Sequence, residues 1–254
     1  MNMGLDKPYF VQYGIFLKDA LRGKFGESLS EGRPSMEIII ERIPATLQLG
    51  LAAFAFSVVV GIPLGILSAV KRGTPVDIIG KIVALIGQSA PVFWLGLMLM
   101  FFFAVQLRWL PPYGRQESTS IILPAITLGW FYAAANMRLL RSAMLNVLDS
   151  EYVKLARAKG VSNQVVIWKH SLRNALIPVL TFAGITLGSL VTGSLVVETV
   201  FAWPGLGQLA IKALVGNDYP LLQAVIVIFT LMYVIAALLV DVMYAYIDPR
   251  IRYA

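Results

Sequence analysis

Long runs of apolar residues alternate with shorter polar segments along the 254-residue chain. Runs long enough to cross a bilayer, which takes about 20 residues, lie at roughly 43–70, 82–107, 121–140, 174–197 and 221–246. The pattern predicts an all-α integral membrane domain over residues 43–247, with a segment at 1–42 before it and a short tail at 248–254. Prolines within or near the ends of these runs are tolerable where neighbouring helices satisfy the freed backbone groups.

The distribution of Lys and Arg predicts the orientation of these runs. Twelve of the 21 basic residues fall in the connections at 71–81 and 138–173 and in the tail. Only three fall in the connections at 106–120 and 198–220. Because basic connections stay in the cytoplasm, the first group is expected inside and the second outside. The net charge of +7 therefore reflects topology rather than nucleic-acid binding, and alternation places residues 1–42 outside.

Composition narrows the chemistry further. The chain is 58% hydrophobic and 14% charged, with a mean hydropathy of +0.75, far from soluble globular averages. It has no cysteine, and its single histidine, His170, cannot form a metal site alone. It also has no phosphate-binding loop, nucleophile elbow or paired-histidine zinc motif. We therefore expect no catalytic, metal or cofactor site.

The polar segment from Asp149 to Pro178 is too elaborate for a simple connection. Ser150 and Glu151 supply a helix start, with a capping oxygen and negative charge at the positive end of the helix. Gly160 supplies a stop, because it can take the left-handed conformation that ends a helix. A second start follows at Ser162. This predicts a short helix lying flat at the membrane surface and offered to a partner; the alternative is an ordinary solvated loop.

The segment resembles the cytoplasmic coupling loop of ABC importer permeases, in their dipeptide, oligopeptide and nickel branch. The resemblance rests on Tyr152-Val153, on Ala156-Arg157-Ala158-Lys159-Gly160, and on His170-Ser171-Leu172-Arg173-Asn174-Ala175-Leu176-Ile177-Pro178. Lys154, Leu155 and Arg173 depart from the general form of the loop, but these departures suit the peptide branch.

The resemblance implies a type I ABC importer permease fold in a plasma (inner) membrane. It also implies a second homologous permease, two ATPase subunits that use the ATP, and an extracytoplasmic solute-binding protein. The ATPase would dock on one set of residues: Glu151, Tyr152, Lys154, Leu155, Ala156, Arg157, Lys159 and Gly160. Related permeases carry a further N-terminal helix, so we expect that the sequence lacks the first of six helices.

Polar and small residues in two spans are candidates for lining a pathway. The span at 174–197 is rich in Gly, Ser and Thr, and a polar pair precedes Pro91 in the span at 82–107. Helix packing explains both features equally well. The residues chosen are Gln88, Ser89, Thr186, Ser189 and Thr192. By resemblance, the external loop at 198–220 lies near the entrance for substrate.

These observations together predict an ATP-driven importer subunit, with di- or oligopeptides as the cargo. Nickel or another small solute is the alternative within the same class. A self-sufficient secondary transporter is the alternative outside it. Proton-coupled carriers commonly place acids near the midplane, and the only acid noted within a predicted span is Asp241.

Overall fold

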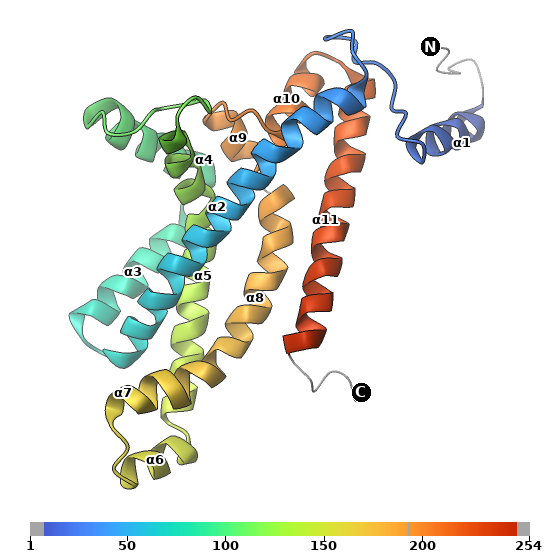
Figure 1. Ribbon diagram of the computed structural model, residues 1–254. Coiled ribbons are helices and arrows are strands. Elements are labelled where there is room, and N and C mark those ends of the chain that lie inside the picture. The colour runs from blue at the N-terminus through green and yellow to red at the C-terminus, as the bar shows by residue number, and fades with distance from the viewer. Residues whose placement is uncertain (1–7, 193, 248–254) are drawn as a thin grey trace.

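The computed structural model describes residues 8–192 and 194–247, and this part of the chain is almost entirely helical (Figure 1). Its one strand-like feature is an isolated bridge between Glu27 and Pro34. The elements are α1 (Tyr9–Ala20), α2 (Ser35–Val70), α3 (Pro75–Ser89), α4 (Val92–Leu99), η1 (Met100–Gln106), η2 (Ser118–Ile121), α5 (Ile122–Leu148), α6 (Glu151–Ala158), α7 (Asn163–Val165), η3 (Val166–Ser171), α8 (Leu172–Thr192), α9 (Leu195–Val200), α10 (Leu206–Val215) and α11 (Tyr219–Ile247). Of these, η1 and η3 are π-helices and η2 is a 3₁₀-helix.

The pairing of α2 with α5 forms the centre of the bundle, with α3, α8 and α11 packed around it. Glycines permit the close approach of the two backbones. A Cβ added at Gly61 would lie 2.7 Å from the carbonyl oxygen of Ala133, and one added at Gly65 would lie 2.9 Å from that of Met137. Small residues at such spacing allow membrane helices to pack tightly.

Four helical stretches are long and apolar enough to cross a membrane, or five if a bent pair is counted as one span. The bent pair covers the predicted span at 82–107 and begins before it. Here α3 and the α4–η1 stretch are separate helices, and the chain bends by 112° between them. Pro91 causes the break, because it keeps the preceding residue extended, and Ala90 accordingly has ψ 133°.

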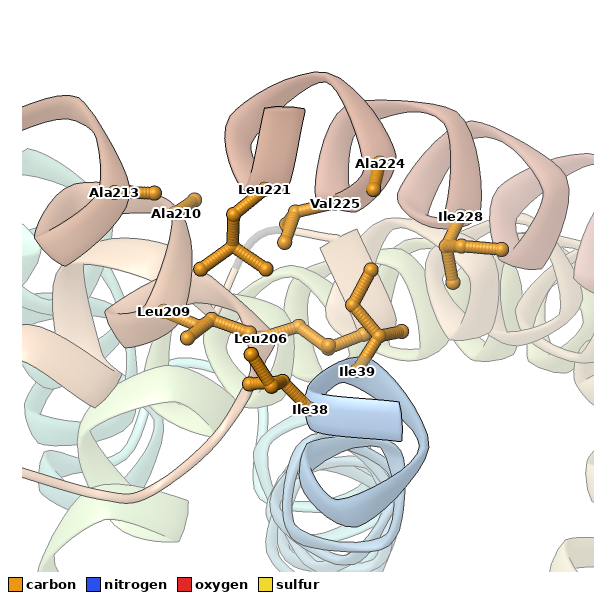
Figure 2. Packing of buried hydrophobic residues seen from close by; sticks show 10 residues of the cluster. All are labelled: Ile38, Ile39, Leu206, Leu209, Ala210, Ala213, Leu221, Ala224, Val225 and Ile228. Atoms are coloured by element: carbon orange, nitrogen blue, oxygen red, sulfur yellow. The ribbon is translucent and has the colours of Figure 1, made fainter. Parts of the chain in front are cut away.

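The first long helix begins earlier than predicted. The helix α2 starts at Ser35, so residues 35–42 belong to it rather than to an external loop. Ile38 and Ile39 are completely buried and pack against α10 and α11 (Figure 2). The sequence did not indicate this helix start, because the charges of Glu37, Glu41 and Arg42 hide the short apolar face.

The apolar stripe of Val11, Phe16, Leu17 and Leu21 near the N-terminus predicts a helix that packs on the protein. Instead α1 lies apart from the bundle in Figure 1 and has no buried residue. Leu21 is 83% exposed, so the expected packing is wrong for the described chain. The tail at 248–254 lies outside the described residues.

Candidate functional site

The helix α6 lies at one end of the molecule, between α5 and the helical stretch that continues through α7 and η3 into α8 (Figure 1). Its ends follow local rules. Ser150 is the extended N-cap residue, and Gly160 takes φ +80°, the left-handed conformation expected of a helix stop. One detail was wrong: the Ser150 hydroxyl donates to the Val147 carbonyl at 2.5 Å and does not cap α6.

Three contacts anchor α6 to the body of the protein. Val153 is completely buried. The Tyr152 hydroxyl accepts a hydrogen bond from the Asn174 side chain at 3.0 Å and donates to the His170 carbonyl at 3.5 Å. His170 lies in η3, and π-helical turns occur frequently at functional sites. These contacts join α6 to η3 and α8.

The remaining surface of α6 faces away from the chain. Leu155 is 57% exposed and Tyr152 45% exposed. Lys154 pairs with Glu151 at 2.7 Å, whereas Arg157 and Lys159 form no ion pair among the described residues. Of the predicted docking residues, all are exposed except the half-buried Ala156. They include two exposed apolar side chains, Tyr152 and Leu155, and two cations, Arg157 and Lys159, that have no ion-pair partner within the described chain.

The predicted pathway residues do not form one group. Gln88 is half-buried and Ser89 exposed at the end of α3, where the chain bends toward α4. On α8, Thr186 is buried and its hydroxyl donates to the Ala183 carbonyl at 3.0 Å. Ser189, also on α8, is half-buried. Thr192 ends α8, and its side chain lies outside the described residues.

A buried carboxylate, missed in the sequence, joins three helices near the α6 end. Asp77 in α3 is completely buried. Its Oδ1 accepts hydrogen bonds from Ser68 at 2.5 Å and Arg141 Nε at 2.7 Å. Its Oδ2 accepts from Arg141 Nη2 at 2.9 Å and the Gly73 amide at 3.0 Å, and Lys81 lies 3.3 Å away. This cluster joins the α2–α3 turn to α5, the helix that leads into α6.

A second buried carboxylate lies at the opposite end. Glu198 in α9 is completely buried. Its Oε1 accepts hydrogen bonds from Thr46 at 2.8 Å and Ser194 at 2.7 Å. Its Oε2 accepts from the amides of Gly207 at 2.7 Å and Gln208 at 3.1 Å. Those amides belong to the first turn of α10, where a negative charge is favoured.

The surroundings of Glu198 tie α9 and α10 to α2. Thr46 also accepts the Leu206 amide at 2.8 Å, and the indole of Trp203 donates to the Ala45 carbonyl at 2.8 Å. A Cβ added at Gly205 would collide with the Glu198 carboxylate, so only glycine fits there. We call Glu198 and its four donors the Glu198 latch.

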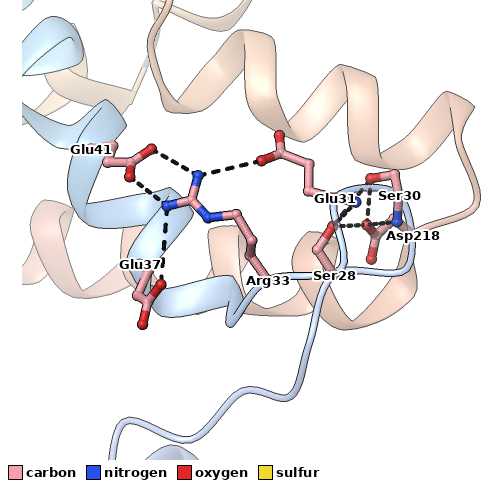
Figure 3. Close-up of polar contacts among 7 residues, drawn as sticks. All are labelled: Ser28, Ser30, Glu31, Arg33, Glu37, Glu41 and Asp218. Carbon is pink, nitrogen blue, oxygen red and sulfur yellow. Dashed lines mark hydrogen bonds and ion pairs between the residues drawn. The ribbon is translucent and has the colours of Figure 1, made fainter.

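Asp218, between α10 and α11, forms a comparable contact with the N-terminal segment (Figure 3). Its Oδ2 accepts hydrogen bonds from the Ser28 hydroxyl at 2.5 Å and from the Ser30 hydroxyl and amide at 2.7 and 3.1 Å. Its Oδ1 accepts the Leu221 amide at 3.3 Å in the first turn of α11. Burial would raise the pKa of Asp218, but these hydrogen bonds outweigh it and lower the pKa to about 2. We call this group the Asp218 latch.

The lowered pKa of Asp218 gives a pH-dependent prediction. Because the folded pKa of about 2 is below the ordinary value of 3.8, the stabilisation is complete above pH 4 and is lost as pH falls toward 2. We expect Asp218→Asn to lower the thermal unfolding midpoint of the detergent-solubilised protein at pH 7. The difference from wild type should shrink as the pH is lowered toward about 2. A difference that is equal at both pH values would contradict this assignment.

Neither buried acid was noted in the sequence. Asp77 lies in α3, which begins at Pro75 and so before the predicted span at 82–107. Glu198 lies in the short helix α9, outside the helices long enough to cross a membrane. The signal available in the sequence was the pair of glycines, Gly205 and Gly207, that follows Trp203-Pro204. Glycine is required where another group packs directly against the backbone, as the Glu198 carboxylate does here. Nothing nearby in the sequence identified Thr46 as the partner.

Comparison with known proteins adds independent findings. The family model described as "Binding-protein-dependent transport system inner membrane component" matches residues 61–253. The chain is 40% identical to the dipeptide transport system permease protein DppB of Alkalihalophilus pseudofirmus, over 99% of this chain and 84% of that protein. It is 44% identical to the glutathione transport system permease protein GsiC of Pectobacterium atrosepticum, over 99% of this chain and 82% of that protein. An inward-facing structure of the MetNI methionine ABC transporter matches the fold with a TM-score of 0.70 at 23% identity, over 84% of this chain and 97% of that one.

Proposed function

Because the chain belongs to the family of binding-protein-dependent transport system inner membrane components, the permeases of ABC importers, we propose that it forms half of the translocation pathway for peptides and is driven by a separate ATPase docked on α6. The observation that carries the proposal is α6 itself. It is anchored by Val153, and it exposes Leu155 and Tyr152 on other faces and Arg157 one turn beyond Val153. An exposed apolar face flanked by cations suits a protein partner better than solvent.

Movement of α6 would be transmitted along two routes. The first passes through η3 into α8, by way of the Tyr152 contacts to Asn174 and His170. The second passes into α5, which the Asp77–Arg141 pair joins to α2 and α3. Closure of the ATPases would push α6 and rock these helices between inward-open and outward-open states.

The proposed assembly contains a second, homologous permease, two ATPase subunits and an extracytoplasmic solute-binding protein, in the lipid bilayer of an inner membrane. The α6 end and the C-terminal tail face the cytoplasm, as the basic connections predict, and nucleic acid has no part in it. This chain binds no cofactor of its own, and the ATP is consumed by the partners. The candidate pathway residues remain Gln88, Ser89, Thr186, Ser189 and Thr192.

Peptides are favoured as the cargo because two relatives, at 40% and 44% identity, are named for dipeptide and glutathione transport. Nickel or another small solute is the alternative cargo. A secondary transporter is disfavoured for a physical reason. A proton-coupled carrier needs a buried acid that gains and loses its proton, whereas Asp77 and Glu198 have their oxygens occupied by hydrogen-bond donors.

A charge placed on the exposed face of α6 tests the docking surface. We expect Leu155→Glu to abolish co-purification of the ATPase after mild solubilisation, because burying an unpaired carboxylate in an interface is costly. Leu214→Glu is the matched control, since Leu214 is 55% exposed on α10 at the opposite end (Figure 1). Equal recovery of the ATPase with both variants would refute docking on α6.

Gly160→Asp tests the end of the same helix. No atom of this chain lies within 4 Å of a Cβ built at Gly160, so the internal cost is that of the left-handed backbone, about 1–2 kcal/mol. We therefore expect normal membrane insertion, continued ATP hydrolysis by the assembled complex, and loss of peptide uptake. Uptake at the wild-type rate in reconstituted vesicles would remove Gly160 from the coupling surface.

A further inference from the structure

A cavity of about 250 Å³ opens at the end of the molecule opposite α6. It lies between the loop that follows residue 27, the start of α2, and the helices α10 and α11. Leu209, Ala213 and Leu221 form its apolar floor and belong to the buried cluster of Figure 2. The polar lining consists of Ser30, Glu31, Arg42, Gln208 and Lys212.

Both buried latches hold the walls of this cavity in place. Ser30 is fixed by two hydrogen bonds to Asp218, and the backbone of Gln208 is fixed by Glu198. The opposing walls therefore come from segments far apart in the sequence, each tied to a buried carboxylate. A binding site with rigid walls loses little conformational entropy when a ligand enters.

The acidic residue of the cavity has a cation nearby, whereas the two basic residues form no ion pair in the part of the chain that the structure describes. Glu31 lies 3.9 Å from Arg33, and Glu41, beside Arg42 in the sequence, pairs with Arg33 at 2.5 Å (Figure 3). Arg42 and Lys212 form no ion pair within 4.0 Å among the described residues. Arg42 is half-buried and Lys212 is exposed. Within the described chain, the cavity thus holds two cations from two different helices that form no ion pair, beside one carboxylate, Glu31, that lies near Arg33. The Glu41 carboxylate also lies near enough to Arg42 for an electrostatic attraction.

We propose that this cavity binds a carboxylate group between Arg42 and Lys212. A guanidinium and an ammonium are the side chains that bind carboxylates most strongly, and Gln208 and Ser30 add neutral hydrogen-bonding groups beside them. The carboxylate has two chemical sources: a small solute that reaches this face, or an acidic side chain of a solute-binding protein docked there. The second source rests on the proposed function, and the first does not.

Binding of a free small carboxylate is measured with this chain in lipid nanodiscs, either within its complex or alone. The probe is N-acetylglycine, and N-acetylglycinamide is the neutral isostere. The test variant is Arg42→Gln/Lys212→Gln. The control is Arg22→Gln/Lys24→Gln, which removes the same charge from exposed positions outside the cavity. We expect only the carboxylate to bind, and the test variant to weaken its binding about tenfold or more, as loss of charged hydrogen bonds does.

The docked carboxylate is tested by the affinity of the solute-free binding protein for the complex, with the same two variants. Loss of docking with the test variant alone, without binding of N-acetylglycine, supports a carboxylate supplied by the protein. Binding of N-acetylglycine that requires Arg42 and Lys212 supports a free solute. If the test variant changes neither measurement, the cavity is not a carboxylate site. Co-purification of the ATPase is scored separately, so that failure of the importer assignment is distinguishable from failure of this one.

Discussion

Glu198→Ala is expected to be the most damaging single substitution in the chain. The alanine would remove the acceptor of the buried Thr46 hydroxyl, the buried Gly207 amide and the partly buried Gln208 amide. Each orphaned group costs about 1–3 kcal/mol, so the total loss of unfolding free energy is about 3 kcal/mol or more. That is a large share of the about 5–15 kcal/mol that keeps a typical domain folded. We expect little protein in the membrane and a strongly lowered thermal midpoint for what remains.

Glu37→Ala is the matched control. The Glu37 side chain is 62% exposed, and its ion pair with Arg33 is long, at 4.0 Å. It should leave yield and thermal midpoint close to those of wild type. Glu198→Gln should be intermediate, since the amide keeps one acceptor oxygen but presents N–H groups where the second oxygen was. A Glu198→Ala variant as stable as the Glu37 variant would show that the latch does not hold α10 on α2.

Asp77→Ala is expected to have the second largest effect. It would leave the Arg141 guanidinium, only 20% exposed, without its bidentate partner. Breaking a buried pair from one side costs about 3–5 kcal/mol. We expect a lower thermal midpoint and, in the assembled complex, ATP hydrolysis that drives uptake less effectively, because α3 would lose its hydrogen bonds to α5 and the α2–α3 turn would lose the hydrogen bond that ties it to this pair.

The double variant Asp77→Ala/Arg141→Leu separates the lost pair from the stranded charge. It should recover part of the stability, since the unpaired cation is removed as well, and the coupling energy follows from the complete cycle. Asp149→Ala is the control: its partner Arg72 lies 3.6 Å away and both side chains are largely exposed, so a change under about 1 kcal/mol is expected. A double variant less stable than Asp77→Ala would contradict a stranded charge as the main cost.

Local signals in the sequence were sufficient for some features. Ser150, Glu151 and Gly160 mark the ends of α6 because capping and left-handed stops depend on a few adjacent residues. Pro91 favours a bend in the span at 82–107, because proline interrupts a helix. The size of the bend, 112°, could not be predicted, because it depends on how α4 packs on distant parts of the chain. Gly96 in α4, for example, packs so closely that an added Cβ would lie only 3.1 Å from the Phe201 ring.

The three buried carboxylates could not be predicted for the same reason. Asp77 and Arg141 are 64 positions apart, Glu198 and Thr46 are 152 apart, and Asp218 and Ser28 are 190 apart. No pattern of period two or 3.6 relates residues at such separations. The carboxyl groups looked like ordinary loop charges until the fold placed donors around them. The cavity beside Arg42 was hidden in the same way, since its walls come from both ends of the chain.

These separations set an order of events during synthesis. Chains fold from the N-terminus as they are made, yet Thr46 cannot bond to Glu198, nor Ser28 to Asp218, until most of the protein has entered the membrane. Until then, the outer end of α2 lacks its hydrogen bond to Glu198, and the segment before it lacks those to Asp218. A chain interrupted before residue 198 would leave Ile38 and Ile39 without the helices that bury them. We expect membrane proteases to degrade such a chain. The last part of the chain to be made thus completes the fold of the first.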